Sequence, residues 1–417
     1  MQSVKVLLVA GARPNFMKIA SIVDAIATHN RLCRKPLIHP VLVHTGQHYG
    51  EQMSRSFFRD LGMPQPDVEL EVGSASHAHQ TAEIMKRFEP CLIQQAPDAL
   101  LVVGDVNSTV ACSLVASKIS YPSSGFGRTR PLIAHVEAGL RSFDRSMPEE
   151  INRILTDVLS DLLFVSEPSG VENLLREGTS RKKIHRVGNT MVDTLLKHRK
   201  SAMKSSILSQ LGLDFESVPQ GKPEPHTKRK QNRRRRTCID YAVVTLHRPS
   251  NVDRRRTFQV ILEALSEIAQ VIPVFFPVHP RTTKQIREYG FEKYFSIDAK
   301  LQARDWQRAR IQAIEPLGYL DFLCLMSNAR LVLTDSGGIQ EETSVLGIPC
   351  VTLRENTERP VTLTEGTNVL AGTDKARIVK CALRQMRLAG KPNRPRYWDG
   401  KTGERIVKIL IDQLCQQ

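Results

Sequence analysis

Short apolar runs recur along this chain, and each is followed by a polar turn and then by a segment with helical periodicity. Such runs are typical of strands buried on both faces, and their alternation with helices predicts a parallel sheet covered on both sides. In the first half, the predicted strands are 4–10, 40–45, 99–104, 132–137 and 161–166, and the predicted helices include 17–28 and 108–120.

The same pattern restarts after a break, which predicts a second α/β unit. Its predicted strands are 241–246, 274–278, 331–334 and 349–353, and its predicted helices are 258–269, 320–328 and 338–346. A chain of 417 residues also exceeds what one hydrophobic core usually holds. We place the domain boundary between Leu195 and Ser217, where the strands stop and a basic insert begins.

The insert 221–236 carries much of the net charge of +16, because it holds eight Lys or Arg and one Glu. We interpret it as a solvated loop, with a nuclear-import or nucleic-acid-binding patch as the alternative. No aromatic residue interleaves the cations, which disfavours stacking on bases, so we expect no nucleic-acid partner. A second surface loop is predicted at 123–130.

The eight cysteines form no CxxC pair, and no Cys or His pair has zinc-ligand spacing. This usage indicates a reducing compartment, so we expect a cytoplasmic protein without a metal site. No apolar run reaches the roughly 18 residues of a membrane helix, and the N-terminus resembles a strand more than a signal peptide. We therefore expect no membrane partner.

Ligands of parallel sheets bind beyond the carboxyl ends of the strands, so the residues there are the informative ones. Arg13 and Lys18 follow the first strand at a turn that opens a helix, which suits a diphosphate. Ordinary solvation of a helix start explains them equally well. The turn is neither a GxGxxG loop nor a P-loop, which removes the main support for a dinucleotide or Walker-type ATP site.

Three carboxylates follow strands or open helices in the first half: Asp105, Glu137 and Glu149. Asp105 is also explained as a helix cap, and Glu149 as an acidic residue in a first helical turn. Glu137, however, follows an apolar run directly, where a carboxylate is costly unless it is paired or functional. Convergence of the three would split their pKa values and supply a proton donor and a proton acceptor.

In the second half, His247 and His279 each follow a strand and lie near an arginine, which favours an anionic ligand. A Ser336-Gly337-Gly338 turn follows another strand and opens a helix, so backbone N–H groups can approach a phosphate there. One turn into this helix, Glu342 is placed to accept two ribose hydroxyls. Arg354 and Arg359 could complete the phosphate site.

Taken together, these motifs resemble the non-hydrolysing UDP-N-acetylglucosamine 2-epimerase family. The resemblance runs from Val4 to about Thr373 through GARPNFMK, TGQHYG, GDVNST, HVEAGLRSFDRSMPEEINR, VGNTMVDTL, TLHRPSN, PVHPR, IEPLGYLDF, TDSGGIQEE and ENTERP. It implies a GT-B-type α/β fold with two Rossmann-like domains, whose parallel sheets face an interdomain cleft. The expected domains are 1–200, joined by a C-terminal helix at 400–417, and 201–399, with the basic insert.

The resemblance also implies roles for individual residues. Asp105, Glu137 and Glu149 resemble the acid/base carboxylates, and His247 a catalytic histidine near the diphosphate. The implied substrate contacts are Arg13, Lys18, Phe322 on the uracil, Ser336, Gly337 and Gly338 at the diphosphate, Glu342 at the ribose, and Arg359. Gln47, Gln80 and His279 lie where some bacterial members hold a second, activating UDP-sugar.

Two departures from the family pattern bear on these roles. The common His-Arg-x-Glu-Asn segment reads His247-Arg248-Pro249-Ser250-Asn251 here, so any role of that glutamate is missing. The commoner Ala-Gln-His segment reads Gly46-Gln47-His48, which puts activation by a second substrate molecule in doubt.

The resemblance implies reversible C2 epimerisation of UDP-N-acetylglucosamine to UDP-N-acetylmannosamine, by elimination and re-addition of UDP. We expect no cofactor and a homodimer. The alternatives are a hydrolysing epimerase, a GT-B glycosyltransferase, and a catalytically silent UDP-sugar sensor or nucleic-acid-binding protein. The residues do not reveal which carboxylate is the acid and which the base.

Overall fold

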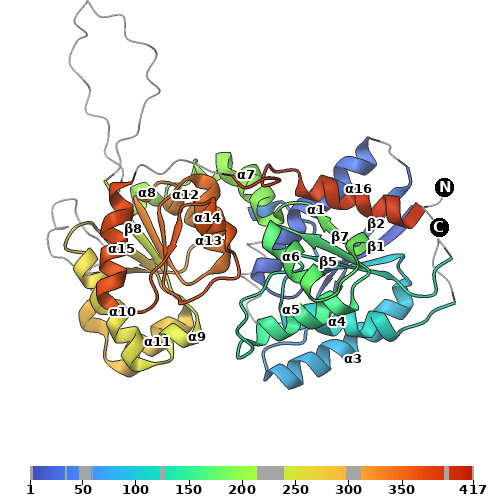
Figure 1. The fold of residues 1–417 in the computed structure, drawn as a ribbon, viewed down its shortest axis with the longest axis horizontal. Coiled ribbons are helices and arrows are strands. Elements are labelled where there is room, and N and C mark those ends of the chain that lie inside the picture. The colour runs from blue at the N-terminus through green and yellow to red at the C-terminus, as the bar shows by residue number, and fades with distance from the viewer. Residues whose placement is uncertain are drawn as a thin grey trace, which may run out of the picture. The chain divides into compact units, whose positions relative to one another are not determined.

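A computed structural model describes residues 3–32, 35–46, 58, 60–122, 127–213, 239–296, 311–388 and 394–415 (Figure 1). Gln47, the insert 221–236 and part of the loop predicted at 123–130 lie outside the described residues. The chain divides into two compact units. Unit 1 is Met1–His198 with Thr357–Glu365 and Arg394–Gln417, and unit 2 is Arg199–Asn356 with Gly366–Asn393.

The sheet of unit 1 has seven strands in the order β3-β2-β1-β4-β5-β6-β7, and all of its pairs are parallel. The order reverses between β1 and β4, and in doubly wound folds this switch point is where ligands bind. The strands are β1 (Ser3–Ala10), β2 (Leu37–His44), β3 (Val68–Glu69), β4 (Ala99–Val103), β5 (Leu132–Val136), β6 (Leu162–Val165) and β7 (Ile184–Arg186).

Helices cover both faces of this sheet, with α1 and α16 on one face and α3, α4 and α5 on the other (Figure 1). The helices of this unit are α1 (Arg13–Arg31), α3 (His77–Gln95), α4 (Asn107–Lys118), α5 (Pro148–Leu159), α6 (Pro168–Arg176), the 3-10 helix η1 (Arg181–Lys183), α14 (Val361–Thr364) and α16 (Thr402–Cys415). Helix α7 (Thr190–Ala202) contains the boundary between the two units.

Unit 2 repeats this topology with a six-stranded parallel sheet in the order β10-β9-β8-β11-β12-β13. Its strands are β8 (Ala242–Thr245), β9 (Val274–Pro277), β10 (Gln312–Ile314), β11 (Leu331–Thr334), β12 (Cys350–Thr352) and β13 (Asn368–Leu370). Its helices are α8 (Ile207–Gln210), α9 (Pro249–Val252), α10 (Arg255–Ile268), α11 (Pro280–Tyr289), η2 (Glu292–Tyr294), α12 (Tyr319–Ser327), α13 (Gly337–Leu346) and α15 (Lys375–Arg387).

The predicted α/β class with two parallel sheets is confirmed, and each predicted strand corresponds to a strand of one sheet. Four strands were not predicted: β3, β7, β10 and β13. They are the edges of the two sheets and have only two or three residues each. Such short strands lack the long apolar run that reveals a central strand, because they pair on one side only.

The units differ from the predicted domains in two segments. Thr357–Glu365 and the residues from Arg394 onward cluster with unit 1, although the prediction assigned 201–399 to the second domain. Trp398 is fully buried, and its indole N–H donates to the Ser166 carbonyl at 3.0 Å, beyond the end of β6. Burial of this large side chain anchors the segment that leads into α16.

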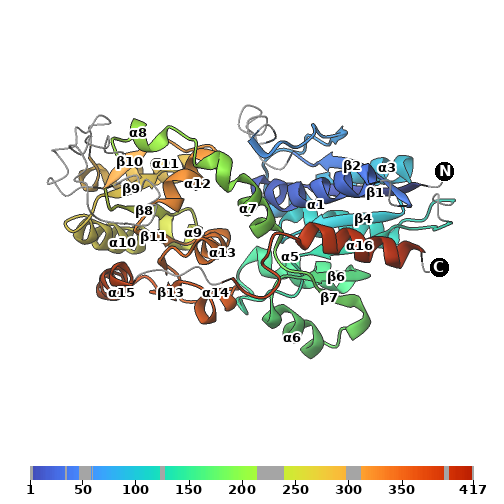
Figure 2. The ribbon, with the colours of Figure 1, turned by 90° about the horizontal axis from the view of Figure 1, so that it is seen from above.

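Helices α1 and α16 lie side by side although they are close to opposite ends of the chain (Figure 2). Gly403 permits this packing, because an added Cβ would lie 2.4 Å from the carbonyl oxygen of Ser21 in α1. The backbone N–H of Gly403 also donates to Asp193 of α7 at 2.9 Å. Among the described residues, no helix combines the length and apolar content required to cross a membrane.

We predict that Gly403→Ala destabilises unit 1. In an open helix, Ala in place of Gly stabilises by about 1 kcal/mol. Here the new methyl group would overlap a backbone carbonyl that cannot move freely, and overpacking costs about 1–3 kcal/mol. Subtracting the gain from the cost gives an expected net loss of up to about 2 kcal/mol by denaturant unfolding. Lys408→Ala, at an exposed position of the same helix, is the control, and a stabilised Gly403→Ala would contradict the packing argument.

Candidate functional site

Unit 1 places a buried carboxylate directly after β5. Glu137 is 5% exposed, and its carboxylate pairs with Lys18 at 2.6 Å and Arg359 at 2.5 Å. Both cations are themselves buried, Lys18 in α1 and Arg359 just before α14. Glu137 has a φ of 73°, a left-handed conformation that is strained for a residue other than glycine. Strain of this kind is typical of functional sites, where surrounding contacts maintain it.

A second carboxylate lies in the turn after β4, at the switch point of the sheet. Asp105 pairs with Arg153 of α5, and the Asp105 side chain keeps 22% of its surface exposed. The turn is made by Gly104, with a φ of 68°, and an added Cβ there would lie 2.8 Å from the Lys18 ammonium. Lys18 therefore lies beside both the Asp105 turn and Glu137, so the predicted convergence of these two carboxylates is present in the structure.

The cations determine the ionisation of both carboxylates. Burial by itself raises the pKa of Asp105, but the charges of Arg153, Lys18 and Arg359 outweigh it and hold that pKa well below its usual value. Burial also raises the pKa of Glu137, and Lys18 and Arg359 again outweigh it and lower that pKa. Both groups are therefore carboxylates at neutral pH, and each can accept a proton.

The first turns of α5 connect to this cluster through Glu150 and Arg153. Arg153 is 1% exposed and bridges Asp105 and Glu150, contacting Glu150 at 2.6 Å. Glu150 accepts from the backbone N–H groups of Ser142 and Phe143, at 2.9 and 3.0 Å, and so fixes the loop before α5. The predicted acid/base residue Glu149 is half-buried in the same turn.

Unit 2 has a separate set of polar residues at the carboxyl ends of β8 and β11. Asp335 is fully buried and accepts from the backbone N–H groups of His247 and Arg248, at 3.1 and 3.0 Å. Its other oxygen lies 3.2 Å from Nδ1 of His247, whose side chain is 49% exposed. The Asn251 amide also donates to Asp335, at 3.1 Å. Asp335 therefore holds the turn after β8 and leaves the outer edge of the His247 ring accessible.

The Ser336-Gly337-Gly338 turn opens α13 as predicted, with Ser336 as its N-cap residue. One turn further, Glu342 is 3% exposed beside Glu341. Burial, reinforced by the Glu341 charge, raises the pKa of Glu342 to about 8, so this carboxyl is protonated at neutral pH. Phe322 is half-buried in α12, the helix that begins with the buried Tyr319.

The residues predicted to bind a second UDP-sugar have internal contacts. Gln80 is buried, donates to the Gly73 carbonyl at 2.9 Å and accepts from Asn107 at 2.8 Å. His279 is the N-cap residue of α11 and accepts from the Arg281 N–H at 3.2 Å. Gln47 and the side chain of Arg13 lie outside the described part of the chain. The activating role of these residues stays a prediction.

Sequence reasoning assigned no role to Arg153, Glu150 or Asp335. Asp335 directly follows β11, so the strand-end signal that identified Asp105 applies to it equally. Arg153 and Glu150 gave a weaker signal, because charged residues in a helix are usually solvated. Their spacing of three residues puts both on one face of α5, but only tertiary contacts show that this face is buried.

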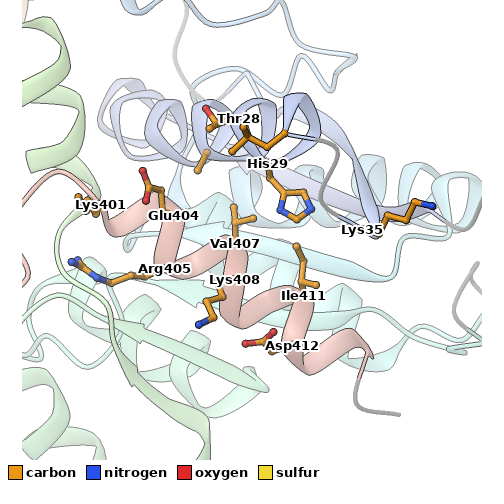
Figure 3. A pocket seen from close by; sticks show the side chains of 12 residues that line it. Thr28, His29, Lys35, Lys401, Glu404, Arg405, Val407, Lys408, Ile411 and Asp412 are labelled. Atoms are coloured by element: carbon orange, nitrogen blue, oxygen red, sulfur yellow. The ribbon is translucent and has the colours of Figure 1, made fainter.

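The rest of the described structure offers no metal-binding cluster, and it has a groove away from the candidate site. In the described part of the chain, no group of three or more His, Cys, Asp or Glu side chains could hold a metal ion. A groove of about 530 Å³ lies between α1 and α16, with side chains such as His29, Arg405 and Asp412 along it (Figure 3). None of the predicted site residues lines this groove.

Comparison with known proteins gives a consistent result. Residues 30–411 match the family model described as UDP-N-acetylglucosamine 2-epimerase. The chain is 40% identical over 409 residues to UDP-N-acetylglucosamine 2-epimerase from Methanocaldococcus jannaschii, covering 97% of this chain and 98% of that protein. It is 36% identical to UDP-2,3-diacetamido-2,3-dideoxy-D-glucuronate 2-epimerase from Pseudomonas aeruginosa, with 97% and 99% covered.

A solved structure extends the likeness to three dimensions. The crystal structure of the M. jannaschii UDP-GlcNAc 2-epimerase in complex with UDP-GlcNAc and UDP is similar to this chain with a TM-score of 0.80. The sequence identity is 38%, and the alignment covers 98% of this chain and 99% of that one.

The raised pKa of Glu342 makes a prediction about pH. Between about pH 4.5 and pH 8, the folded protein holds a proton that the unfolded chain has released, so stability falls as pH rises through this window. Glu342→Gln removes that loss. The free energy of unfolding of Glu342→Gln minus that of the parent should therefore increase with pH, by on the order of 1.4 kcal/mol per pH unit from pH 5 to pH 8. Denaturant titrations at four pH values measure this difference.

Glu292→Gln, at an exposed position in η2 of the same unit, is the matched control for the substitution itself. A constant difference for Glu342→Gln would show that the carboxyl ionises normally in the folded protein.

Proposed function

Because the chain belongs to the UDP-N-acetylglucosamine 2-epimerase family, we propose that it is an enzyme that interconverts UDP-N-acetylglucosamine and UDP-N-acetylmannosamine. The observation that carries this proposal is the pair of ionised carboxylates, Asp105 and Glu137, each paired with buried cations at adjacent strand ends. The substrate is supported by the M. jannaschii enzyme, whose structure contains UDP-GlcNAc and UDP.

Inversion at C2 proceeds by elimination and re-addition. A base removes the C2 proton while the C1–O bond to UDP breaks, and C1=C2 forms to give a 2-acetamidoglucal and UDP. Re-addition reverses these changes, with UDP returning to C1 and an acid delivering a proton to the opposite face of C2. No redox cofactor enters this balance. Two proton-handling groups are needed, one for each face.

Unit 1 supplies the proton-handling groups in this proposal. Asp105 and Glu137 are ionised, so each suits the base, and Glu149 is the third candidate. A carboxylate that has accepted a proton becomes the acid for the reverse direction. Lys18 and Arg359, together with Arg13, stabilise the charge that develops on UDP as it leaves. Since Glu137 pairs with two of these cations, their charge is shared between the carboxylate and the diphosphate.

Unit 2 supplies the nucleotide-binding groups. The Ser336-Gly337-Gly338 turn presents N–H groups and the N-terminus of α13 to the diphosphate. His247, held by Asp335, places its ring near the phosphates. The protonated Glu342 can donate one hydrogen bond to a ribose hydroxyl and accept another, and Phe322 packs on the uracil.

The test is incubation with UDP-N-acetylglucosamine alone in heavy water. We expect both epimers, with deuterium at C2 and the UDP group retained. Release of UDP with a free sugar would indicate a hydrolysing epimerase, and an unchanged donor would favour a glycosyltransferase. The 2,3-diacetamido glucuronate substrate of the Pseudomonas relative is the second substrate to compare. Faster turnover of that compound would reassign the sugar.

Within the same assay, Asp105→Asn, Glu137→Gln and Glu149→Gln should each lower turnover at least about a hundredfold. Glu172→Gln is the control, because that glutamate is exposed on α6 in the same unit. Near-normal turnover of all three folded variants would show that the acid/base groups are misassigned.

The proposal also includes a cytoplasmic homodimer that does not bind nucleic acid. Helix α5 supports the dimer, because its polar face is buried while an apolar row faces outward. Leu155 is 48% exposed and Val158 is 75% exposed, and Ile151, Ile154 and Leu159 beside them are half-buried. An uncharged row at helical spacing is self-complementary across a twofold axis.

Light scattering after size exclusion should therefore give twice the chain mass of 46.9 kDa for the parent. The double variant Leu155→Glu, Val158→Glu should be monomeric, because two charges cannot be buried in that interface. Leu175→Glu alters a comparably exposed leucine on α6 and should stay dimeric. A monomeric parent would remove the dimer from the proposal.

A further inference from the structure

The strand that ends at the Glu137 turn contains a fully buried histidine that touches no predicted substrate group. His135 lies in β5, with Nδ1 2.7 Å from an Asp157 carboxylate oxygen and Nε2 2.8 Å from the Gly104 carbonyl oxygen. A carbonyl oxygen only accepts hydrogen bonds. The Asp157 carboxyl also acts as an acceptor, because burial raises its pKa but His135 and Arg141 outweigh this and lower it. Nε2 of His135 therefore donates to the Gly104 carbonyl, and Nδ1 is hydrogen-bonded to the Asp157 carboxyl.

The two acceptors belong to the elements that position the carboxylates. Gly104 immediately precedes Asp105 in the turn after β4. Asp157, on α5, uses its second oxygen to accept from the Gly139 N–H at 3.1 Å, two residues beyond Glu137. His135 and Asp157 thus join the Asp105 turn, the Glu137 turn and helix α5 in one buried hydrogen-bond network.

Further contacts hold this hydrogen-bond network in place. Arg141 pairs with Asp157 at 2.7 Å and with Glu177, at the end of α6, at 2.7 Å. The Gly104 N–H donates to the carbonyl of Val136, and the Glu137 N–H donates to the carbonyl of Phe164, both at 3.0 Å. The Glu137 backbone is therefore held on both sides, which maintains its strained φ.

We infer that His135 is a positioning residue for the epimerisation, holding the turns of Asp105 and Glu137 at a fixed separation through its two hydrogen bonds. This inference rests on the proposed function. Two groups that move a proton at one carbon must be placed within about 0.5 Å of their working geometry. A displacement of about 1 Å lowers turnover on the order of a hundredfold. His135 itself contacts neither the sugar nor UDP, since none of its surface is exposed.

The test compares three variants in the epimerase assay. His135→Leu removes both hydrogen bonds and should lower kcat at least about a hundredfold, with KM and UDP affinity within about threefold of the parent. His135→Gln keeps one donor, which can reach the Gly104 carbonyl, and should lose only about tenfold. His185→Leu is the matched control, because His185 is a partly buried histidine in β7 of the same sheet, and its kcat should stay within about threefold.

Amide hydrogen exchange gives a readout that does not depend on activity. His135→Leu and His135→Gln should exchange faster in the segments 104–107 and 137–141, while β7 and unit 2 keep the parent rates. If the parent is inactive but the His135 variants show these exchange changes, the proposed function is overturned, while the structural role of the His135 hydrogen bonds stands. The inference would be overturned if folded His135→Leu had the kcat and the exchange rates of the parent. If His135→Leu does not fold, the same result in His135→Gln would overturn it. A proportional rise in KM would do so too, by assigning His135 to substrate binding.

Discussion

The candidate site of unit 1 depends on burying carboxylates only where cations are buried with them. Removing a carboxylate from water is costly, and without compensation Asp105 and Glu137 would take up protons. Lys18, Arg153 and Arg359 reverse that preference and keep both groups ionised. Loss of any one cation would weaken the compensation of a carboxylate in this cluster, and removing one partner of a buried pair costs more than the net value of the pair. The same pairing keeps both carboxylates ionised, so they are free to accept a proton at neutral pH.

The topology of the two sheets explains why the charged groups gather where they do. In each unit the strand order reverses at one point, between β1 and β4 or between β8 and β11. The turns that leave neighbouring strands there diverge to opposite faces and leave room for side chains. Lys18 and Asp105 follow the reversing strands of unit 1, and His247 and Asp335 follow those of unit 2. Parallel pairing ensures that these turns all lie at one edge of their sheet.

Helix α5 has the reverse of the usual amphipathic arrangement. A surface helix normally buries its apolar stripe and exposes its charges. Here Glu150, Arg153 and Asp157 are buried, and Leu155 and Val158 face outward. The buried polar face contacts Asp105 and His135, and Glu150 on that face binds the loop before the helix, so one helix fixes several parts of the site. Its apolar face is the surface of the proposed dimer, and both properties lie within residues 150–158, about two and a half helical turns.

Much of this protein was determined by its sequence alone. Apolar runs and helical periodicity are local signals, so they specified both α/β units, their central strands, the strand-end positions of Asp105, Glu137 and His247, and the place of Glu342 in the helix after β11. Short edge strands such as β7 and β13 escaped, because one-sided pairing requires no apolar run. Tertiary structure alone decided which charges are paired: Arg153 joins Asp105 across 48 positions, and Arg359 joins Glu137 across 222. Ion pairs between distant positions leave no periodic trace in a sequence, because the fold brings their partners together and desolvation then makes the pairing obligatory.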